Sequence, residues 1–413
     1  MARHPRVVFI STYPPQQCGI ATFTQHLIDA MPHDGSPKDV RVAAIVGEGD
    51  RAEFGDRVVH LIDNTRPAAY REAAAWVNLK DIDVVCLQHE FGLFAGECGR
   101  DVISFLKACH KPVVTTLHTV LPEPNPIQRE ILSAVGRQSR RIVAMAKVGI
   151  DLLADRYGVS RAKMVFVAHG VPQVAPVDRG AVRRRLGLRG RKVIVTFGLL
   201  SRGKGIEYMV EALPAIRRHH PDVLYLVIGR THPNVLRAEG EAYRETLLRR
   251  SGDLGVTENI RFTNRFVSDD ELLPYLQASD VYVTPYLGRD QITSGTLSYA
   301  VAAGCAVVST PYLYAEELLA DGRGRLAEFR SGESLAGEIN AILDSPALRR
   351  RLKARAYRYG RSMTWASVAR RYHGLFTEVA QARGPAVRQP RTPARRPPLL
   401  PSRADGPASW PRV

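Results

Sequence analysis

No run of about 18 consecutive apolar residues, the length that a membrane-spanning helix needs, occurs in the chain. Cysteine is scarce as well: the five cysteines among 413 residues are an odd number, which argues against a disulfide framework. The first residues run directly into an apolar, strand-like segment at residues 7–10, so we expect no separate signal segment. Together these absences favour a reduced, cytoplasmic protein.

Candidate metal ligands are not grouped in a familiar spacing. Cys86, Cys98, Cys109 and His110 stand near one another but include no C-x2-C pair, and the chain has no His-Glu-x-x-His motif. A zinc site is one interpretation of this group, and ordinary buried thiols are the other, which we favour. We therefore expect no metal site and no cofactor.

Lysine is also rare, because nine lysines and 49 arginines make up the 58 basic residues, and the net charge is +17. The last 31 residues, 383–413, hold seven of the arginines and eight prolines, a composition that predicts a disordered tail. The remaining positive charge suits an anionic small substrate or a membrane surface as well as nucleic acid. Since no nucleic-acid-binding motif is present, we expect no nucleic-acid partner.

Short apolar runs recur along the chain with helical patterns between them. Such runs are typical of buried parallel strands in β-α-β units. They predict an α/β fold of two doubly wound, Rossmann-like domains. The runs are 7–12, 42–46, 84–87, 113–117, 142–145 and 164–168 in the first half, and 193–198, 224–229, 260–263, 281–286 and 306–310 in the second.

The predicted join lies near residues 171–190, where a proline-containing linker precedes a short arginine-rich helix. We place an N-terminal domain at 1–172 and a C-terminal domain at 189–357. A last helical stretch carries several aromatic residues, and we expect its part at 358–382 to complete the N-terminal domain by packing across both.

In two domains of this kind the ligand lies at the carboxyl ends of the strands, and the informative loops of this chain follow strands. Gly19 opens a helix whose free N–H groups favour an anion, with an ordinary turn as the alternative. Arg202 and Lys204 flank a glycine, which suits a phosphate or a solvated basic turn. The segment 293–296, Thr-Ser-Gly-Thr, opens a helix with hydroxyls and free N–H groups for a second phosphate face.

Three histidines, His89, His118 and His169, each follow a strand of the predicted N-terminal domain. One such histidine is usually structural. Three at one rim favour hydrogen bonds to substrate hydroxyls, and the lack of a carboxylate cluster argues against metal ligation.

These segments together resemble the retaining family 4 glycosyltransferases (glycosyl transferases group 1). Members of that family have the two-domain GT-B fold and use nucleotide-diphosphate sugars. The resemblance extends over residues 6–380 and implies two domains that face each other across a cleft. Its motifs are residues 195–205, which look like the family's G-R-L-x-x-x-K-G loop, and residues 264–267, 271–275, 278–285, 301–308 and 317–322.

The resemblance implies roles for individual residues. Lys204 would lie on the diphosphate of the donor and His118 near the transferred sugar. Leu199 stands where the family has an arginine, which makes Arg202 a candidate replacement. The expected donor-binding residues are Gly19, Arg265, Phe266, Val267, Ser294, Gly295, Thr296 and Tyr299, and the expected acceptor-binding residues are His89, Glu90 and Glu123.

The chain departs from the family at the Glu-x7-Glu motif, whose two glutamates fall on Gln291 and Tyr299. In the family the first glutamate contacts the donor sugar and the second the ribose hydroxyls. Gln291 keeps its hydrogen-bonding capacity without charge, whereas Tyr299 cannot accept two ribose hydroxyls as a carboxylate does. Asp290, one residue out of register, is a candidate for compensation.

We therefore predict a retaining, metal-independent hexosyltransferase with His118, Arg202, Lys204 and Gln291 as catalytic residues. Mannose from GDP-mannose is the favoured donor, and glucose from UDP-glucose is next. The acceptor is a hydroxyl of a glycan, a lipid-linked sugar or a small molecule. A hexose phosphorylase-like enzyme and an inactive protein that binds nucleotide sugar or glycan are the alternatives.

Location is a separate question. The arginines between residues 183 and 191 are candidates for contact with the inner face of a membrane, and a solvated linker helix is the favoured alternative.

Overall fold

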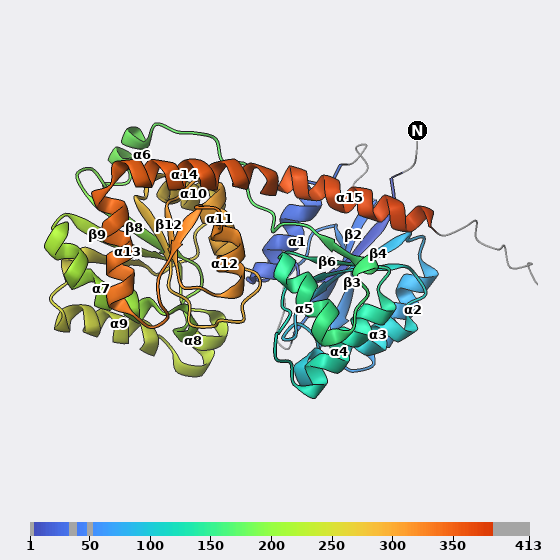
Figure 1. The fold of residues 1–413 in the computed structure, drawn as a ribbon. Coiled ribbons are helices and arrows are strands. Elements are labelled where there is room, and N and C mark those ends of the chain that lie inside the picture. Colours follow the sequence, from blue (N-terminus) through green and yellow to red (C-terminus); the bar gives the residue numbers. More distant parts are fainter. Residues whose placement is uncertain (1–3, 33–38, 48–52, 383–413) are drawn as a thin grey trace, which may run out of the picture.

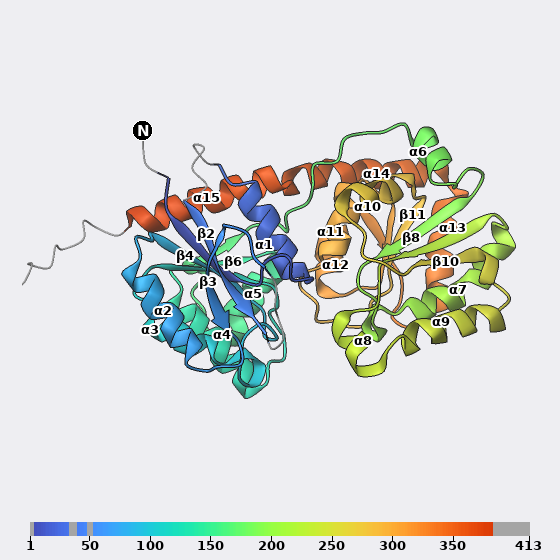
Figure 2. The ribbon, with the colours of Figure 1, turned by 180° about the vertical axis from the view of Figure 1, so that it is seen from behind.

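The computed structural model describes residues 4–32, 39–47 and 53–382, so the predicted tail at 383–413 lies outside the described residues. In the described part the chain forms two sheets, each covered by helices on both faces (Figure 1). The two sheets stand side by side, as the view from behind also shows (Figure 2).

The first sheet contains, within the described residues, seven parallel strands in the order β3-β2-β1-β4-β5-β6-β7. Its strands are β1 Val7–Ser11, β2 Val40–Val46, β3 Val58–Asp63, β4 Val84–His89, β5 Val113–Leu117, β6 Arg141–Ala144 and β7 Met164–Phe166. Alternation along β1 sends Val8 and Ile10 into one core cluster and Val7 and Phe9 into another, so both faces are buried.

The second sheet contains, over the same described residues, six parallel strands in the order β10-β9-β8-β11-β12-β13. Its strands are β8 Lys192–Phe197, β9 Val223–Ile228, β10 Ile260–Thr263, β11 Val281–Thr284, β12 Val307–Ser309 and β13 Gly324–Leu326. The strand order reverses at β8, and ligands of such sheets bind outside the carboxyl ends of the strands at this reversal.

The helices follow the strands in chain order. Those of the first domain are α1 Gly19–Asp29, α2 Ala69–Leu79, η1 Glu97–Gly99, α3 Val102–Ala108, α4 Pro126–Gln138, α5 Lys147–Tyr157 and η2 Arg161–Lys163. The linker helix is α6 Arg179–Arg185. The helices of the second domain are η3 Arg202–Lys204, α7 Ile206–His219, α8 Pro233–Glu239, α9 Ala242–Asp253, η4 Thr257–Asn259, α10 Asp269–Ala278, α11 Gly295–Ala302, α12 Leu313–Leu319 and α13 Gly332–Asp344.

The last helical stretch runs along both domains (Figure 1) and consists of α14 Pro346–Gly360, η5 Arg361–Met363 and α15 Trp365–Gln381. α14 lies on the second domain, where a Cβ on Gly360 would be 2.5 Å from the Cα of Ala302 in α11. α15 lies on the first domain, where the ring centroid of Phe376 is 6.1 Å from that of Phe9 in β1. The domain limits at 172, 189 and 357 stay a prediction.

The eleven strands expected from apolar runs are all present, but the sequence pattern missed β3 and β13. Both are edge strands. β3 carries His60 in its middle and exposes Val59 and Leu61, and β13 has three residues of which two are exposed. An edge strand needs no continuous apolar run, because part of its surface faces solvent.

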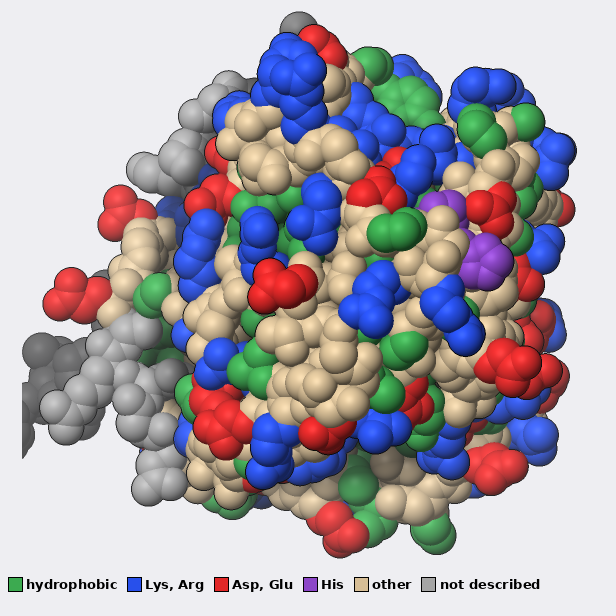
Figure 3. Space-filling model, turned by 90° about the vertical axis from the view of Figure 1, so that its left-hand side faces the viewer, with side chains coloured by type: hydrophobic (Ala, Val, Ile, Leu, Met, Phe, Trp, Pro, Cys, Tyr) green, Lys and Arg blue, Asp and Glu red, His purple; other side chains and the backbone are tan. Residues whose placement is uncertain are grey.

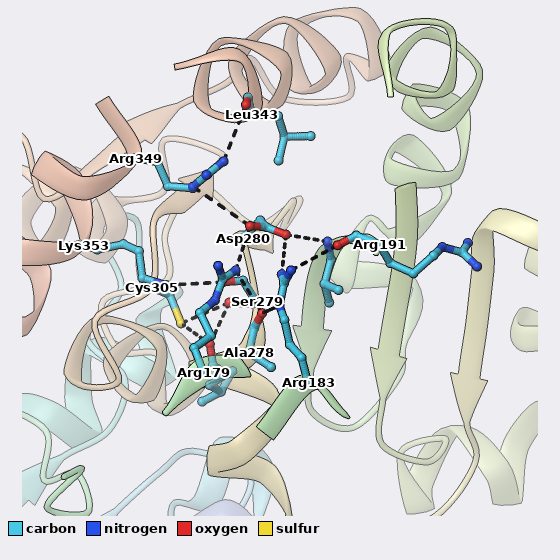
Figure 4. Close-up of polar contacts among 12 residues, drawn as sticks. Arg179, Arg183, Arg191, Ala278, Ser279, Asp280, Cys305, Leu343, Arg349 and Lys353 are labelled. Atoms are coloured by element: carbon cyan, nitrogen blue, oxygen red, sulfur yellow. Dashed lines mark hydrogen bonds and ion pairs between the residues drawn. The ribbon is translucent and has the colours of Figure 1, made fainter. Parts of the chain in front are cut away.

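The arginine-rich helix α6 is tied to the second sheet through a buried carboxylate, that of Asp280 (Figure 4). Arg179 and Arg183 bind the two oxygens of this carboxylate at 2.7 and 2.5 Å, and the backbone N–H of Val193 donates to it at 2.8 Å. Burial opposes ionisation of Asp280, but these partners outweigh it and lower its pKa. Of the arginines considered for membrane contact, Arg183 is thus engaged inside the fold, whereas Arg184 is exposed.

Candidate functional site

Loops from both sheets meet where the two domains adjoin. A Cβ on Gly295, the first residue of α11, would lie 3.2 Å from Nε2 of His169, which follows β7 of the first domain. The backbone N–H groups of Lys147 and Val148 donate to the Glu317 carboxylate of α12 at 2.9 and 3.0 Å. The start of α11 and His169, both singled out in the sequence, therefore lie at this junction.

The basic loop after β8 presents Lys204 to the loop after β11. Its Nζ atom lies 3.9 Å from the ring centroid of Tyr286, close enough for a cation–π contact. Gly205 has φ +63°, and a Cβ there would lie 2.0 Å from the carbonyl oxygen of Pro285. The two loops can approach this closely because residue 205 is glycine. Lys204 forms no ion pair with any residue in the described part of the chain.

Arg202, predicted to stand beside Lys204 in catalysis, turns to a different partner. Its guanidinium binds the Glu239 carboxylate of α8 at 2.8 Å and lies 5.5 Å from the ring centroid of Tyr243. More than half of its side chain is exposed. The structure thus does not bring Arg202 and Lys204 to a common partner.

The first turn of α11 brings hydroxyls and N–H groups together. The Ser294 hydroxyl accepts from the backbone N–H of Leu297 at 3.2 Å and caps the helix. The Thr296 hydroxyl lies 2.7 Å from that of Tyr286, the tyrosine whose ring contacts Lys204. A cationic side chain and the positive end of a helix dipole therefore lie close to one tyrosine, an arrangement that suits a diphosphate.

The histidines of the first domain are held neutral by burial. Burial, with His169 and His89 nearby, lowers the pKa of His118 to about 3, and burial lowers the pKa of His169 to about 4. The rings of both contact Phe23 of α1 edge-on, at centroid distances of 5.0 and 5.2 Å. Nε2 of His118 is 2.9 Å from Oε1 of Gln88. A neutral imidazole can donate a hydrogen bond to a sugar hydroxyl or accept one from it without adding charge.

The predicted acceptor residues differ in access. His89 is fully buried, and neither ring nitrogen has a hydrogen-bond partner among the described residues. Glu90 is partly buried and accepts from Thr119 at 2.6 Å and from the backbone N–H of Phe91 at 2.9 Å, while burial raises its pKa. Glu123 is exposed. Of the three, Glu123 is exposed, Glu90 is partly buried and His89 is covered.

At the position on α11 where the resemblance leads one to expect a glutamate, the chain has Tyr299, whose hydroxyl contacts the carboxylate of Asp269. The Tyr299 hydroxyl donates to Asp269 of α10 at 3.2 Å and lies 3.5 Å from Nδ1 of His26 in α1. Burial raises the pKa of both Tyr299 and Asp269. His26 and Asp269 were not singled out in the sequence, because three separate elements bring this group together.

The remaining predicted residues are described by their local contacts. Gln291 donates to the carbonyl oxygen of Thr293 at 2.8 Å. Arg265 makes a two-pronged ion pair with Glu271 at 2.9 and 3.0 Å. Phe266 next to it is 55% exposed. Val267 packs against the buried cluster that contains Leu297 of α11. A Cβ on Gly19 would meet nothing within 4 Å, so no steric contact requires glycine there.

Neither a metal centre nor a membrane span is found in the part of the chain that the structure describes. Among those residues no three His, Cys, Asp or Glu side chains are grouped to hold an ion. None of the described helices is both long and apolar enough to cross a bilayer. At the outer end of the second domain, basic and acidic side chains are interspersed (Figure 3).

A cavity of about 230 Å³ lies where the linker passes α14 and α15. Gln173, Tyr357, Arg361 and Arg370 are among its lining residues. None of the predicted site residues lines it.

Comparison with known proteins identifies the family to which the chain belongs. A family model described as Glycosyltransferase Family 4 matches residues 18–173, and one described as Glycosyl transferases group 1 matches residues 178–359. A phosphatidyl-myo-inositol mannosyltransferase of Mycolicibacterium smegmatis is 27% identical over 319 residues, which are 74% of this chain and 75% of that protein. A GDP-mannose-dependent alpha-(1-6)-phosphatidylinositol monomannoside mannosyltransferase of the same organism is 27% identical over 54% of this chain and 57% of its own length.

Solved structures show the same architecture. HepE of Anabaena in complex with UDP has a TM-score of 0.71 at 16% identity, covering 90% of this chain and 100% of that one. Sucrose-phosphate synthase of Thermosynechococcus elongatus has a TM-score of 0.72 at 16% identity, covering 91% and 100%. Two Rossmann-like domains that adjoin at the carboxyl ends of their strands define a GT-B protein. The chain belongs to the glycosyltransferases of the group 1/family 4 type.

Proposed function

We propose that the chain is a retaining mannosyltransferase that uses GDP-mannose, with UDP-glucose as the second candidate donor. The observation that carries the proposal is Lys204 on Tyr286 beside the first turn of α11, since this group supplies positive charge where a diphosphate would leave. The names of similar proteins, which are mannosyltransferases, support mannose.

The proposed reaction forms one bond and breaks one. The bond between C1 of the sugar and the diphosphate oxygen breaks, and a bond from the acceptor oxygen to C1 forms on the same face, which retains the anomeric configuration. The acceptor proton passes to the departing diphosphate. Positive charge develops on the sugar ring, and a neutral His118 adds no repulsion there. Lys204 and the N–H groups of α11 stabilise the negative charge, so the proposal needs no metal ion.

The proposed acceptor is a hydroxyl bound at the first-domain side of the junction, near Glu90 and Glu123. The relatives named above act on phosphatidylinositol derivatives, which favours a lipid-linked acceptor. Three arginines in and after the linker helix are exposed: Arg184, Arg185 and Arg189. They are candidates for contact with an anionic membrane. Flotation with vesicles of phosphatidylcholine, with and without phosphatidylinositol, tests that contact.

The decisive experiment is donor turnover by the full chain with GDP-mannose and UDP-glucose, with phosphatidylinositol vesicles as acceptor. Proton NMR of the product gives the anomeric configuration. We expect an α-linked mannoside from the α-linked donor, and at least a hundredfold loss with Lys204→Ala. Arg249→Gln, an exposed arginine on α9, is the matched control and should keep full activity. A β-linked product would contradict retention.

One observation favours an inactive nucleotide-sugar-binding protein as a second candidate, namely Tyr299 in place of the family carboxylate. Binding of GDP-mannose with no transfer and no hydrolysis would support that candidate over the enzyme.

A further inference from the structure

Arg230 occupies a particular place relative to the loop after β8. Strands β8 and β9 pair in parallel with Phe197 opposite Ile228, and a further bridge joins Leu200 to Thr231. The same register puts Leu199 opposite Arg230. The loops stay in contact past the strand ends, because the N–H of Leu200 donates to the carbonyl oxygen of Arg230 at 2.9 Å.

The alternation of the two strands shows to which side Arg230 belongs. Leu200 is buried with the core cluster on the α7 side of the sheet, and the Thr231 hydroxyl donates to Glu241 beside α9. Their neighbours Leu199 and Arg230 therefore lie on the opposite side, which α11 helps to cover. Ile228, two residues before Arg230, belongs to the same core cluster as Leu297 of α11.

The Arg230 guanidinium has no counter-charge among the described residues. Its Nε atom is buried without a hydrogen-bond partner, and its side chain forms no ion pair with any residue that the structure describes. A partly buried guanidinium without a partner is costly, and an anion that binds beside it recovers that cost. Arg202, by contrast, is already bound to Glu239.

We propose that Arg230 binds the diphosphate of the nucleotide sugar. In this arrangement Arg230, in the loop after β9, supplies the guanidinium that the resemblance leads one to expect at residue 199. Arg230 and Lys204 then approach the diphosphate from neighbouring loops, and Arg202 stays with Glu239. The inference rests on the proposed function, since it assumes a nucleoside diphosphate at this site.

Calorimetric titration of the full chain with GDP, GMP, UDP and UMP tests it. The comparison of diphosphate with monophosphate isolates the contact to the second phosphate. Arg230→Gln should weaken binding of the preferred diphosphate by roughly tenfold to a hundredfold and bring its affinity close to that of the monophosphate. The diphosphate affinity of Arg230→Lys should lie between those of the wild-type chain and Arg230→Gln, because lysine keeps the charge but not the planar guanidinium.

Two controls separate the outcomes. The exposed Arg249→Gln should leave diphosphate affinity unchanged. Thermal unfolding of each variant shows that it is folded. If the wild-type chain binds a diphosphate and Arg230→Gln binds it equally well, the role of Arg230 is wrong while the donor site stands. If the wild-type chain binds none of the four nucleotides, the proposed function fails and the inference fails with it.

Discussion

At the scale of single residues, the junction between the domains combines neutral histidines with unpaired cations. The imidazoles of His89, His118 and His169 are kept uncharged by burial, whereas Lys204 and Arg230 have no carboxylate partner among the described residues. Positive charge is thus concentrated on the second-domain side. A donor with a negatively charged diphosphate and an uncharged sugar matches this division.

His89 gives a prediction about pH. Burial lowers its pKa to about 4 from the usual 6.5. Between these values the unfolded chain binds a proton that the folded chain does not bind, so the free energy of unfolding falls as the pH decreases. The contribution at pH 5 is about 2 kcal/mol. His89→Phe should remove that share of the pH dependence, measured by urea unfolding at pH 7.5 and 5.0. An unchanged pH dependence would show that His89 titrates normally in the folded chain.

At the scale of loops and helices, the position of Lys204 depends on a glycine. Gly205→Ala should lower the free energy of unfolding by about 1–3 kcal/mol, because residue 205 has positive φ and a Cβ would meet the carbonyl oxygen of Pro285. It should also weaken nucleoside diphosphate binding by moving Lys204.

The matched control is Gly203→Ala in the same loop, where a Cβ would meet nothing within 4 Å. Urea unfolding and calorimetric titration measure both effects. Equal effects of the two substitutions would show that the loop tolerates side chains at either place.

The linker helix gives a second prediction at this scale. Asp280→Asn should destabilise the chain by about 3–5 kcal/mol, because it leaves Arg179 and Arg183 without their shared carboxylate. Asp270→Asn, at an exposed position on α10, should change stability by less than about 0.5 kcal/mol. Urea unfolding at pH 7 compares the two. Since the pKa of Asp280 is lowered, its contribution should persist down to the usual pKa of an aspartate and be lost below it.

The elements themselves were largely predictable, and the site was predictable in part. Buried parallel strands leave apolar runs that a reader of the sequence can find, and the loops after them carried Lys204, Ser294 and His118. The edge strands β3 and β13 left no such run. Asp269 and Arg230 were missed for a different reason, because their meaning depends on helix packing and on strand register, which no local pattern records.

At the scale of the whole molecule, Glu317 joins the domains. Its carboxylate caps the first turn of α5 across the junction. Glu317→Ala should loosen the junction, so we expect faster hydrogen exchange at the amides of Lys147 and Val148 and a larger radius of gyration in solution scattering. Glu316→Ala, the exposed neighbour, should change neither. Unchanged exchange in Glu317→Ala would show that other contacts hold the domains.

The path of the last helices has a mechanical consequence. The chain passes between the domains twice, once in the linker after Val171 and once at η5, and the two passages are joined where Val171 pairs with Thr364. Two chain crossings side by side form a hinge between the domains. They oppose twisting and sliding of one domain against the other, and they leave opening about one axis. We therefore expect any domain motion that admits a donor and releases a product to be a rotation about this one hinge axis.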